Sequence, residues 1–424
     1  MAKPLKGIRV LDMSHVIAGP LASFYLAQLG ADVIKVEPPL LGEVLRSMKG
    51  GVDTDTPTGF AALNAGKQSL AVDIRTPEGA DIIRKLAATV DVFIENFRPG
   101  VVARYGLDYD SIKAIRPDIV YCSISGFGQS GDWAQRGAYD HVVQALTGMM
   151  MMSGEGDDAP PLKVGFPVVD VAVGMLGALS IVSSLHLRTR EGVGQYIDAS
   201  MVQASLMLMY PNVSAYLTDA APTRRLGNRG YTGSPAADTY RCADGWLAIA
   251  ANTPAQFRRL TRAIGVEDLC NDPQALDLDA FNLPNGFVVP NDRDFVAARL
   301  QQAFAMRSAG ELEDILSAAD VPAAKVRKLE QFLDEVDEGT CLNLPDYRYD
   351  QNHTSDKLRT RGIGFALDSD REHDAACIKT RAPTLGQDTY TVLTDAGIDE
   401  DTIAQLEVAG IIKVRDASSA PVNA

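Results

Sequence analysis

Two aspartates stand where a carboxylate could do chemistry. Asp170 lies near the start of a long apolar stretch, residues 168–187, and Asp140 precedes a second, shorter apolar stretch. A carboxylate at the start of a helix can simply accept backbone N–H bonds as an N-cap. In the same position the helix dipole would hold it ionised, and an ionised carboxylate can act as a nucleophile. Position alone leaves both interpretations open.

Basic side chains lie at or just beyond the ends of the predicted N-terminal strands. Ligands of open α/β sheets bind at the carboxyl ends of the strands, so these cations could meet an anionic ligand. Residues 1–110 hold 12 bases and 13 acids, whereas the whole chain has a formal charge of −15. Electrostatic repulsion of an anionic ligand is therefore weakest in this part of the chain. Each base could equally be a solvated surface side chain. The residues are Lys35, Lys67, Arg75, Arg98 and Arg104.

Several other chemistries lack the residues that they need. The five cysteines form no C-x-x-C pair and the five histidines have no metal-ligand spacing, so neither a zinc site nor a disulfide framework is predicted. No P-loop, H-E-x-x-H, G-x-S-x-G or EF-hand pattern occurs. Carboxylate chemistry remains open.

The charge also bears on partners and location. An isoelectric point near 4.8 disfavours binding to nucleic acid or an anionic membrane. Two uncharged runs, 171–187 and 199–218, approach the roughly 20 apolar residues of a membrane span, but polar residues in both favour buried core helices. We expect no secretory signal at the N-terminus and a cytoplasmic protein with a small-molecule partner.

The elements that must position these residues alternate along the first half of the chain. Strands are predicted at 8–13, 31–37, 69–74, 91–95, 119–125 and 195–199, with helices such as 77–88 and 109–115 between them and helix 201–209 after the last strand. This alternation is typical of a doubly wound, Rossmann-like α/β sheet.

After residue 211 the pattern changes to a smaller α+β domain. A glycine-rich loop, 227–233, precedes predicted strands 239–242 and 246–250 and helices 254–264 and 297–305. Helices 388–396 and 399–409 return to the first pattern. We therefore expect a large domain of residues 1–210 and 335–424, a small domain of residues 222–330, and linkers at 211–221 and 331–345.

Taken together, several stretches resemble the class III CoA-transferase family, which contains formyl-CoA transferase, carnitine CoA-transferase and α-methylacyl-CoA racemase. They cover about the first half of the chain in the family's order, and the second half is looser. The stretches are G-I-R-V-L-D from Gly7, H-V-I-A-G-P from His15, L-G-A-D-V-I-K-V-E from Leu29, Asn64 with Lys67, D-I-R-T-P-E-G from Asp73, E-N-F-R-P-G from Glu95, S-G-F-G from Ser125 and G-Q-Y-I-D-A-S-M from Gly194.

The resemblance implies an acyl-CoA:carboxylate CoA-transferase in which Asp170 is the nucleophile and passes through an aspartyl-CoA thioester. Tyr139 and Gln144 would orient an acyl or carboxylate group. Gly230 and Gly233 belong to a mobile glycine loop that shields reactive anhydrides from water. Arg229, beside that loop, could bind the second carboxylate of a dicarboxylic substrate, or could be a surface arginine.

The resemblance also implies where coenzyme A would lie, with no cofactor beyond CoA and no metal. Cations in this cleft would pair with phosphates. The family further implies an interlocked homodimer. The expected cleft residues are His15, Val16, Ile17, Ala18, Lys35, Val72, Ile74, Arg75, Asn96, Phe97, Arg98, Arg104 and Tyr105.

Three rival functions stay open at this stage. The racemase branch exchanges an α-proton with a histidine in a G-H-D-like position, where this chain has Tyr139, a weak acid that serves poorly as a base. CoA could also move within one dicarboxylic acid rather than between molecules. The chain could, finally, be a catalytically silent CoA-binding protein.

Overall fold

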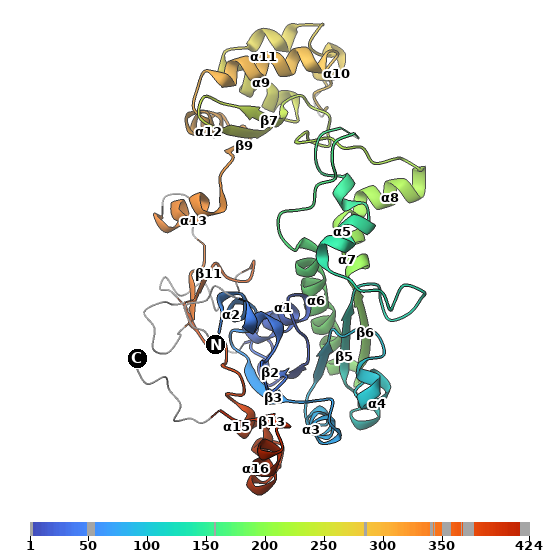
Figure 1. Ribbon diagram of the computed structural model, residues 1–424. Coiled ribbons are helices and arrows are strands. Elements are labelled where there is room, and N and C mark those ends of the chain that lie inside the picture. The colour runs from blue at the N-terminus through green and yellow to red at the C-terminus, as the bar shows by residue number, and fades with distance from the viewer. Residues whose placement is uncertain are drawn as a thin grey trace. The chain divides into compact units, whose positions relative to one another are not determined.

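The computed structural model describes residues 3–48, 56–156, 158–283, 286–339, 342, 344–349, 358–365, 367 and 377–415. These residues form two compact units. The large unit contains residues 1–149, 164–220 and 344–424, and the small unit contains residues 150–163 and 221–343 (Figure 1).

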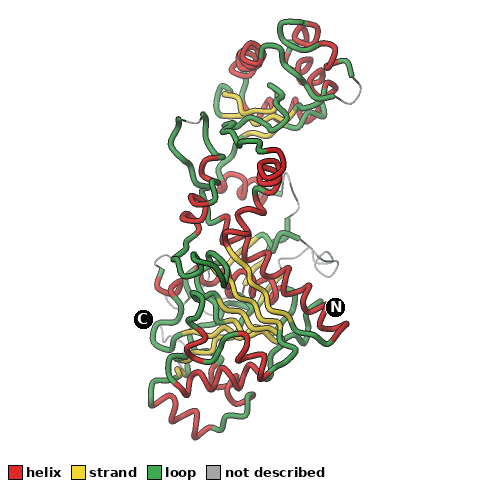
Figure 2. The backbone as a smooth tube through the Cα atoms, turned by 90° about the vertical axis from the view of Figure 1, so that its right-hand side faces the viewer, coloured by secondary structure: helices red, strands yellow, loops and turns green. Residues whose placement is uncertain are grey.

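A seven-stranded sheet forms the centre of the large unit (Figure 2). Its order is β13-β3-β2-β1-β4-β5-β6, and every neighbouring pair is parallel except β13 with β3. The central strands β4 and β5 are buried along their whole length, as expected for parallel strands. The strands are β1 Arg9–Asp12, β2 Asp32–Glu37, β3 Gln68–Val72, β4 Val92–Glu95, β5 Val120–Ser125, β6 Gln195–Ser200 and β13 Ile412–Lys413.

Helices of the large unit connect and cover these strands. An apolar core joins β1–β5 to helices α3, α4, α15 and α16, while α1 and α6 pack against each other. The helices are α1 Ala18–Gln28, α2 Thr58–Asn64, α3 Pro77–Ala87, α4 Tyr109–Ile115, α5 Asp140–Leu146, α6 Val168–Glu191, α7 Met201–Leu208, α8 Tyr210–Asp219, α15 Thr389–Asp395 and α16 Glu400–Val408, with short 3-10 turns η1 Val44–Ser47 and η2 Val102–Tyr105.

Two glycines allow α6 to pass close to its neighbours. A Cβ added at Gly174 would lie 2.7 Å from the carbonyl oxygen of Ala18 in α1. A Cβ at Gly194 would overlap the backbone at Ile119, just before β5. The sequence therefore brings α6 against α1 and returns the chain into β6 through positions that tolerate no side chain.

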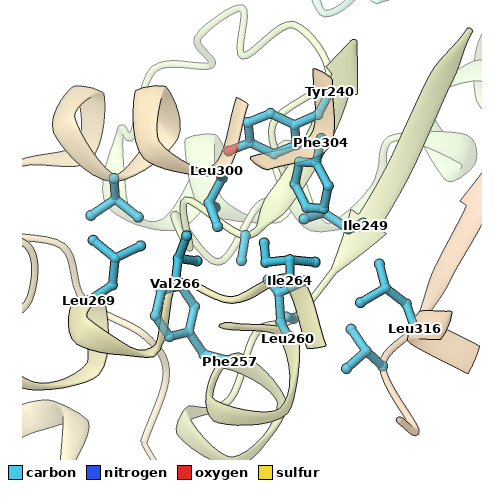
Figure 3. Close-up of a cluster of buried hydrophobic side chains, with 14 of the residues drawn as sticks. Tyr240, Ile249, Phe257, Leu260, Ile264, Val266, Leu269, Leu300, Phe304 and Leu316 are labelled. Atoms are coloured by element: carbon cyan, nitrogen blue, oxygen red, sulfur yellow. The ribbon is translucent and has the colours of Figure 1, made fainter. Parts of the chain in front are cut away.

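The small unit has its own sheet and core. Strands β7 Ala237–Arg241, β8 Trp246–Ala250 and β9 Ala323–Lys325 are antiparallel. Aromatic and aliphatic side chains from this sheet and its helices form one buried cluster that includes Tyr240, Phe257 and Phe304 (Figure 3). The helices are α9 Pro254–Ile264, α10 Leu278–Phe281, α11 Arg293–Ala305, α12 Ala309–Ala318 and α13 Leu329–Asp337, with the 3-10 turn η4 Glu267–Asn271.

The chain boundaries of the two units differ from the expected domain limits. Residues 150–163, expected in the large domain, belong to the small unit, where the Arg225 guanidinium donates to the carbonyls of Ser153 at 2.8 Å and Pro160 at 2.8 Å. The expected linkers at 211–221 and 331–345 overlap α8 and α13, because Pro211 starts α8 at its first turn rather than breaking it. Residues 340, 341 and 343 lie outside the described residues.

The C-terminal part adds β13 and a second small sheet to the large unit. β13 pairs with β3, and the amide N–H of Ser69 donates to Asp388 Oδ2 at 2.8 Å. The small sheet has the order β11-β10-β12, with β10 Tyr347–Tyr349, β11 Leu358–Thr360 and β12 Cys377–Lys379.

The two uncharged runs are less buried than expected. In the described chain, α6 is the one helix long and apolar enough to cross a membrane by length and composition, a test that core helices of soluble proteins also pass. Only 39% of its most apolar stretch is buried, and α8 has no buried residue. The expectation of two core helices was wrong, since α6, α7 and α8 leave much apolar surface uncovered.

A glycine pattern after β5 has the spacing of a dinucleotide-binding loop. Gly126, Gly128 and Gly131 follow β5 directly, yet the chain forms turns and bends until α5 begins at Asp140. A phosphate loop of that type requires a helix to start within the glycine pattern. The loop therefore does not have the geometry of a nicotinamide dinucleotide site.

Candidate active site

A cavity of about 480 Å³ lies at the carboxyl ends of β1–β4. Six of the thirteen residues expected to bind CoA line it, namely His15, Val72, Ile74, Arg75, Phe97 and Tyr105. The other lining residues are Met13, Ser14, Val36, Glu37, Pro38, Gly42, Glu43, Val44, Asp73 and Val101. Strand ends and the turns after them thus form this pocket, as the α/β pattern predicts.

The turn between β1 and α1 forms one wall of the cavity. The N–H of His15 donates to Asn96 Oδ1 at 2.9 Å, and Asn96 Nδ2 donates back to the carbonyl of His15 at 2.8 Å. The imidazole lies against Phe97, with ring centroids 5.2 Å apart. Burial, and then the Lys35 ammonium, lower the pKa of His15, so the ring is neutral at pH 7. Asn96 thus secures the turn, and His15 and Phe97 face the cavity.

Val16, the next residue, has an unusual backbone conformation. Its φ is +68°, and for a β-branched residue this left-handed region is a genuine outlier that costs about 1–3 kcal/mol. Its N–H donates to Glu43 Oε2 at 2.9 Å. Ile17 is the N-cap of α1 and Ala18 its buried first residue, so neither lines the cavity.

Lys35 does not lie where we expected it. Its side chain is fully buried, its Nζ donates to the Ser14 carbonyl at 2.8 Å, and it lies 3.6 Å from Glu43 Oε2. The expectation that Lys35 lines the CoA cleft does not agree with this geometry, because its ammonium is buried and has partners inside the protein.

Lys35 belongs to a larger network of buried charges. Lys67 Nζ lies 3.1 Å from Asp12 Oδ2 and donates to Asn64 Oδ1 at 2.8 Å. Burial alone would raise the pKa of Asp12, but Lys67 and Lys35 lower it to about 2. Burial lowers the pKa of Lys67 to about 8, against the attraction of Asp12.

The same network continues to Glu37 and Arg46. The Arg46 guanidinium binds both oxygens of Glu37, at 2.6 and 2.7 Å, and donates to the Pro383 carbonyl at 3.0 Å. Three buried acids, Asp12, Glu37 and Glu43, thus accompany three buried bases, Lys35, Arg46 and Lys67. Buried charges of one sign are balanced by the other beneath the cavity.

Three expected arginines lie near the surface of this region. Arg75 forms a bidentate pair with Asp73, at 2.8 and 2.7 Å, and its side chain is 73% exposed. Arg98 and Arg104 are exposed, and among the described residues neither has a carboxylate partner. Arg98 and Arg104 therefore remain available to an anionic ligand, whereas Arg75 is already paired.

Asp170 lies in the first turn of α6, as its position in the sequence indicates. The helix has no cap from its own N-cap residue, Pro167. Instead Asp140 Oδ2 accepts the N–H groups of Val169 at 2.7 Å and Asp170 at 3.2 Å. Asp140 therefore performs the capping role that we considered for Asp170.

The surroundings of Asp170 change its titration in the opposite direction to our expectation. Burial, and then the neighbouring Asp140 carboxylate, raise the pKa of Asp170 to about 6. We had expected the helix N-terminus to hold the group ionised. At pH 7 the carboxylate still outnumbers the acid about ten to one, and no base among the described residues pairs with it. Asp170 is thus a partly desolvated carboxylate without a counter-ion.

Gln144 and Tyr139, on either side of Asp140, differ from their expected arrangement. Gln144 is fully buried, its Nε2 donates to Asp140 Oδ1 at 2.5 Å, and its Oε1 accepts the N–H of Val164 at 2.9 Å. The amide therefore holds Asp140, and both of its ends already have partners inside the protein. Tyr139 is 70% exposed.

The glycine loop lies in the small unit. The N–H of Gly230 donates to the Ala237 carbonyl at 2.7 Å, and Gly233 has a φ of +75° that only glycine adopts freely. Arg229 is exposed and its Nε donates to the Leu226 carbonyl at 2.7 Å. Arg225 is buried, and its guanidinium donates to the backbone carbonyls of Ser153, Ala159 and Pro160.

Sequence reasoning missed Glu43, Asp12 and Arg46. Glu43 lines the cavity and binds the turn at Val16, yet it lies in an irregular segment between β2 and α2 without periodic pattern. Asp12 lies near the end of the predicted strand 8–13, and the one signal in the sequence is a charged residue at the end of an apolar run. The structure buries it beside Lys67.

Comparison with known proteins gives the family. A profile of "CoA-transferase family III" matches residues 5–389. The chain is similar to succinate–glutarate CoA-transferase of Agrobacterium fabrum, with 39% identity over 63% of this chain and 68% of the relative. It is also similar to succinyl-CoA:glutarate CoA-transferase of Mus musculus, with 30% identity over 97% of this chain and 91% of the relative.

A solved structure agrees with these sequence comparisons. A CAIB/BAIF family protein from Brucella suis has a TM-score of 0.77 and 29% sequence identity to this chain, covering 93% of this chain and 100% of that protein. With the family profile over nearly the whole length and the relatives above, the chain belongs to CoA-transferase family III.

Proposed function

We propose that this protein transfers CoA from an acyl-CoA to a dicarboxylic acid and that Asp170 carries the transferred groups in turn. The observation that supports this most directly is the state of Asp170, a partly buried carboxylate at the start of α6 with a pKa of about 6 and, within the described part of the chain, no cation beside it. Such a carboxylate is ionised at neutral pH and only weakly solvated, which favours nucleophilic attack. The relatives named above act on succinate and glutarate, which are dicarboxylates.

The reaction exchanges acyl bonds in four steps. The Asp170 carboxylate attacks the donor thioester carbonyl, a C–O bond forms, the C–S bond breaks, and CoA leaves as a thiolate with an acyl-aspartyl anhydride behind it. The thiolate then attacks the aspartyl carbonyl, which releases the donor acid and leaves an aspartyl-CoA thioester. The acceptor carboxylate displaces the thiolate to form a second anhydride. The thiolate finally takes the acceptor acyl group and frees Asp170.

Different parts of the chain would serve this sequence of steps. Arg98 and Arg104 are exposed beside the cavity region and would meet the phosphates of CoA. Holding CoA in place keeps the thiolate near the anhydride between steps, which makes its return effectively intramolecular. Gly230 and Gly233 would shield the anhydrides from water, and Arg229 would bind the second carboxylate of the substrate.

Apolar surface on α6, α7 and α8 supports a homodimer. Met175 and Leu179 of α6, Met207 of α7 and Leu217 of α8 are each at least about half exposed. Large exposed apolar side chains gathered on consecutive helices are typical of an interaction site. We propose that a second copy of the chain covers it.

The order of six strands in the large sheet, β3-β2-β1-β4-β5-β6, matches that of doubly wound folds. We propose that the large unit has a doubly wound fold.

The test is to trap the covalent intermediate. The protein is incubated with succinyl-CoA, with and without glutarate, and is then treated with hydroxylamine or borohydride before peptide mass analysis. We expect a changed mass on the peptide that contains Asp170, a hydroxamate in place of its carboxyl after hydroxylamine and an alcohol in its place after borohydride. Asp294→Asn is a matched control, because Asp294 also lies in the first turn of a helix, α11, and the mass should appear in that variant unchanged. A protein that turns over substrates without any adduct on Asp170 would contradict the proposal.

A further inference from the structure

Among the described non-glycine residues, Val16 is the one with a positive φ that does not lie at the C-terminal end of a helix. The other non-glycine residues with positive φ are Ala220, which ends α8, and Asp320, which follows α12. A residue past a helix terminus often takes this conformation. Val16 instead lies between β1 and α1, with a β-branched side chain that disfavours φ of +68°. Something other than local preference must hold it there.

The peptide groups on both sides of His15 are held entirely by side chains. Lys35 Nζ binds the Ser14 carbonyl, and Glu43 Oε2 accepts the N–H of Val16. Asn96 binds the N–H and the carbonyl of His15. All four polar backbone groups around His15 therefore depend on three side chains from different segments of the chain.

Glu43 and Lys35 act together in this arrangement. Their charged groups lie 3.6 Å apart and both side chains are almost wholly buried, at 3% and 0% exposed. Glu43 Oε1 is buried and has no hydrogen-bond partner among the residues that the structure describes. A buried carboxyl with one oxygen lacking a hydrogen bond lowers the stability of the fold. The orientation of Glu43 is therefore better explained by its other oxygen, Oε2, which accepts the N–H of Val16.

We propose that Glu43, assisted by Lys35, is a positioning residue that keeps the turn at His15 and Val16 in the conformation that forms the wall of the CoA cavity. The proposal rests on the function proposed above, because CoA is taken as the ligand. Without the carboxylate, Val16 would relax toward negative φ and the wall would move. CoA affinity would then depend on an acid that acts through the turn.

A rescue experiment separates this role from a merely structural one. Glycine adopts positive φ without a steric penalty, so Val16→Gly should make the turn less dependent on Glu43. We expect Glu43→Ala to weaken CoA binding about tenfold by calorimetry, and Glu43→Gln, which keeps an acceptor oxygen, by less than about threefold. In the Val16→Gly background, Glu43→Ala should weaken binding less than about threefold relative to Val16→Gly alone.

Equal losses from Glu43→Ala in both backgrounds would overturn the proposal, because Glu43 would then act on CoA directly or on overall stability. Urea midpoints check that each variant is folded, and Glu313→Gln, which breaks a pair with Arg327 in the small unit, should leave CoA affinity unchanged.

A second measurement needs no ligand. Amide hydrogen exchange of the peptide over residues 13–18 should become faster in Glu43→Ala than in the parent, since the Val16 N–H loses its acceptor. Unchanged exchange would overturn the proposal even if CoA binds. If the parent protein binds no CoA while exchange does respond, the proposed function fails and the role of Glu43 in the turn stands.

Discussion

Among the described residues, buried charged groups are paired in one region of the large unit and unpaired in another. Beneath the cavity, three acids and three bases are interleaved, and Asp12 has a pKa of about 2. At the start of α6, Asp140 caps the helix beside Asp170, no described base pairs with Asp170, and burial and the Asp140 charge raise its pKa to about 6. Both regions lie in the same unit, and similar side chains have contrary electrostatic states.

This difference indicates that the paired region serves ligand binding and the unpaired Asp170 serves the reaction. A balanced network with many hydrogen bonds is rigid, which suits a binding wall that must keep its shape. A carboxylate that lacks a counter-ion and part of its hydration is destabilised in the folded protein and gains by forming a covalent bond. Binding and chemistry can therefore be disturbed separately by substitution.

The largest expected effect comes from Asp170→Asn. The amide cannot form the anhydride, so we expect kcat to fall by about 10³-fold or more. CoA affinity, measured by calorimetry, should stay within about twofold of the parent, because the cavity lies at the ends of β1–β4. Parental turnover in this variant would remove the proposed nucleophile.

The next effect tests the balanced network. Lys67→Met leaves Asp12 buried without its nearest cation, and we expect a loss of about 3–5 kcal/mol in the free energy of unfolding by urea denaturation. The exposed pair Arg262–Glu267 provides the control, since Arg262→Met should change stability by less than about 1 kcal/mol. Equal effects would mean that burial of the network contributes little.

A third prediction concerns stability rather than rate. The folded protein holds the Asp170 proton up to a pKa of about 6, whereas the unfolded chain releases it near 3.8. Stability therefore falls as pH rises through that window, because the folded state binds more protons there. Asp170→Asn should be more stable than the parent by about 1–3 kcal/mol above pH 7. The gain should vanish below pH 3.8, and a constant difference across the range would contradict it.

A smaller effect is expected at the phosphate-binding arginines. Arg104→Ala should weaken binding of CoA about tenfold and leave that of pantetheine, which carries no phosphate, unchanged. Arg75→Ala should cost less, because Asp73 already neutralises this side chain. Calorimetry with both ligands measures the contrast, and a larger loss from Arg75→Ala would reverse the assignment.

The smallest effect is expected from Asp140→Asn. The amide oxygen can still cap α6, but the negative charge that raises the pKa of Asp170 is lost. The acidic limb of the kcat/KM profile should move to lower pH by less than about one unit, because burial remains the larger cause. A shift to higher pH would show that another group controls this limb.

Most strands and helices of both units could be predicted from the sequence. Parallel strands such as β5 are continuous apolar runs between turns, and α9 begins with the capping pair Thr253 and Gln256, so local patterns fix their ends. The run 199–218 was expected to be helical, but the part of α8 after Pro211 was also assigned to a linker because the pattern changes there; proline is tolerated in the first turn. β13 was missed because two residues contain no detectable period.

The candidate site was predicted less completely, and for a physical reason. Asp170, His15 and Phe97 stand in recognisable sequence patterns, and the structure places the last two at the cavity. Lys35 and Glu43 could not be placed, because whether a charged side chain in a strand or in an irregular segment faces solvent or the interior depends on partners distant in sequence. Only the fold shows that Lys35 binds the Ser14 carbonyl and that Glu43 accepts the N–H of Val16.

The pairing of β13 with β3 can form only after nearly the whole chain has been synthesised on the ribosome. From Val72 in β3 to Ile412 in β13 lie about 340 residues, which at about 5–20 residues per second take on the order of 20–70 s to translate. During that interval the outer edge of β3 has no neighbour, and an open strand edge invites pairing with other nascent chains. We therefore expect production of soluble protein to improve with slower initiation or with chaperones that cover the growing polypeptide.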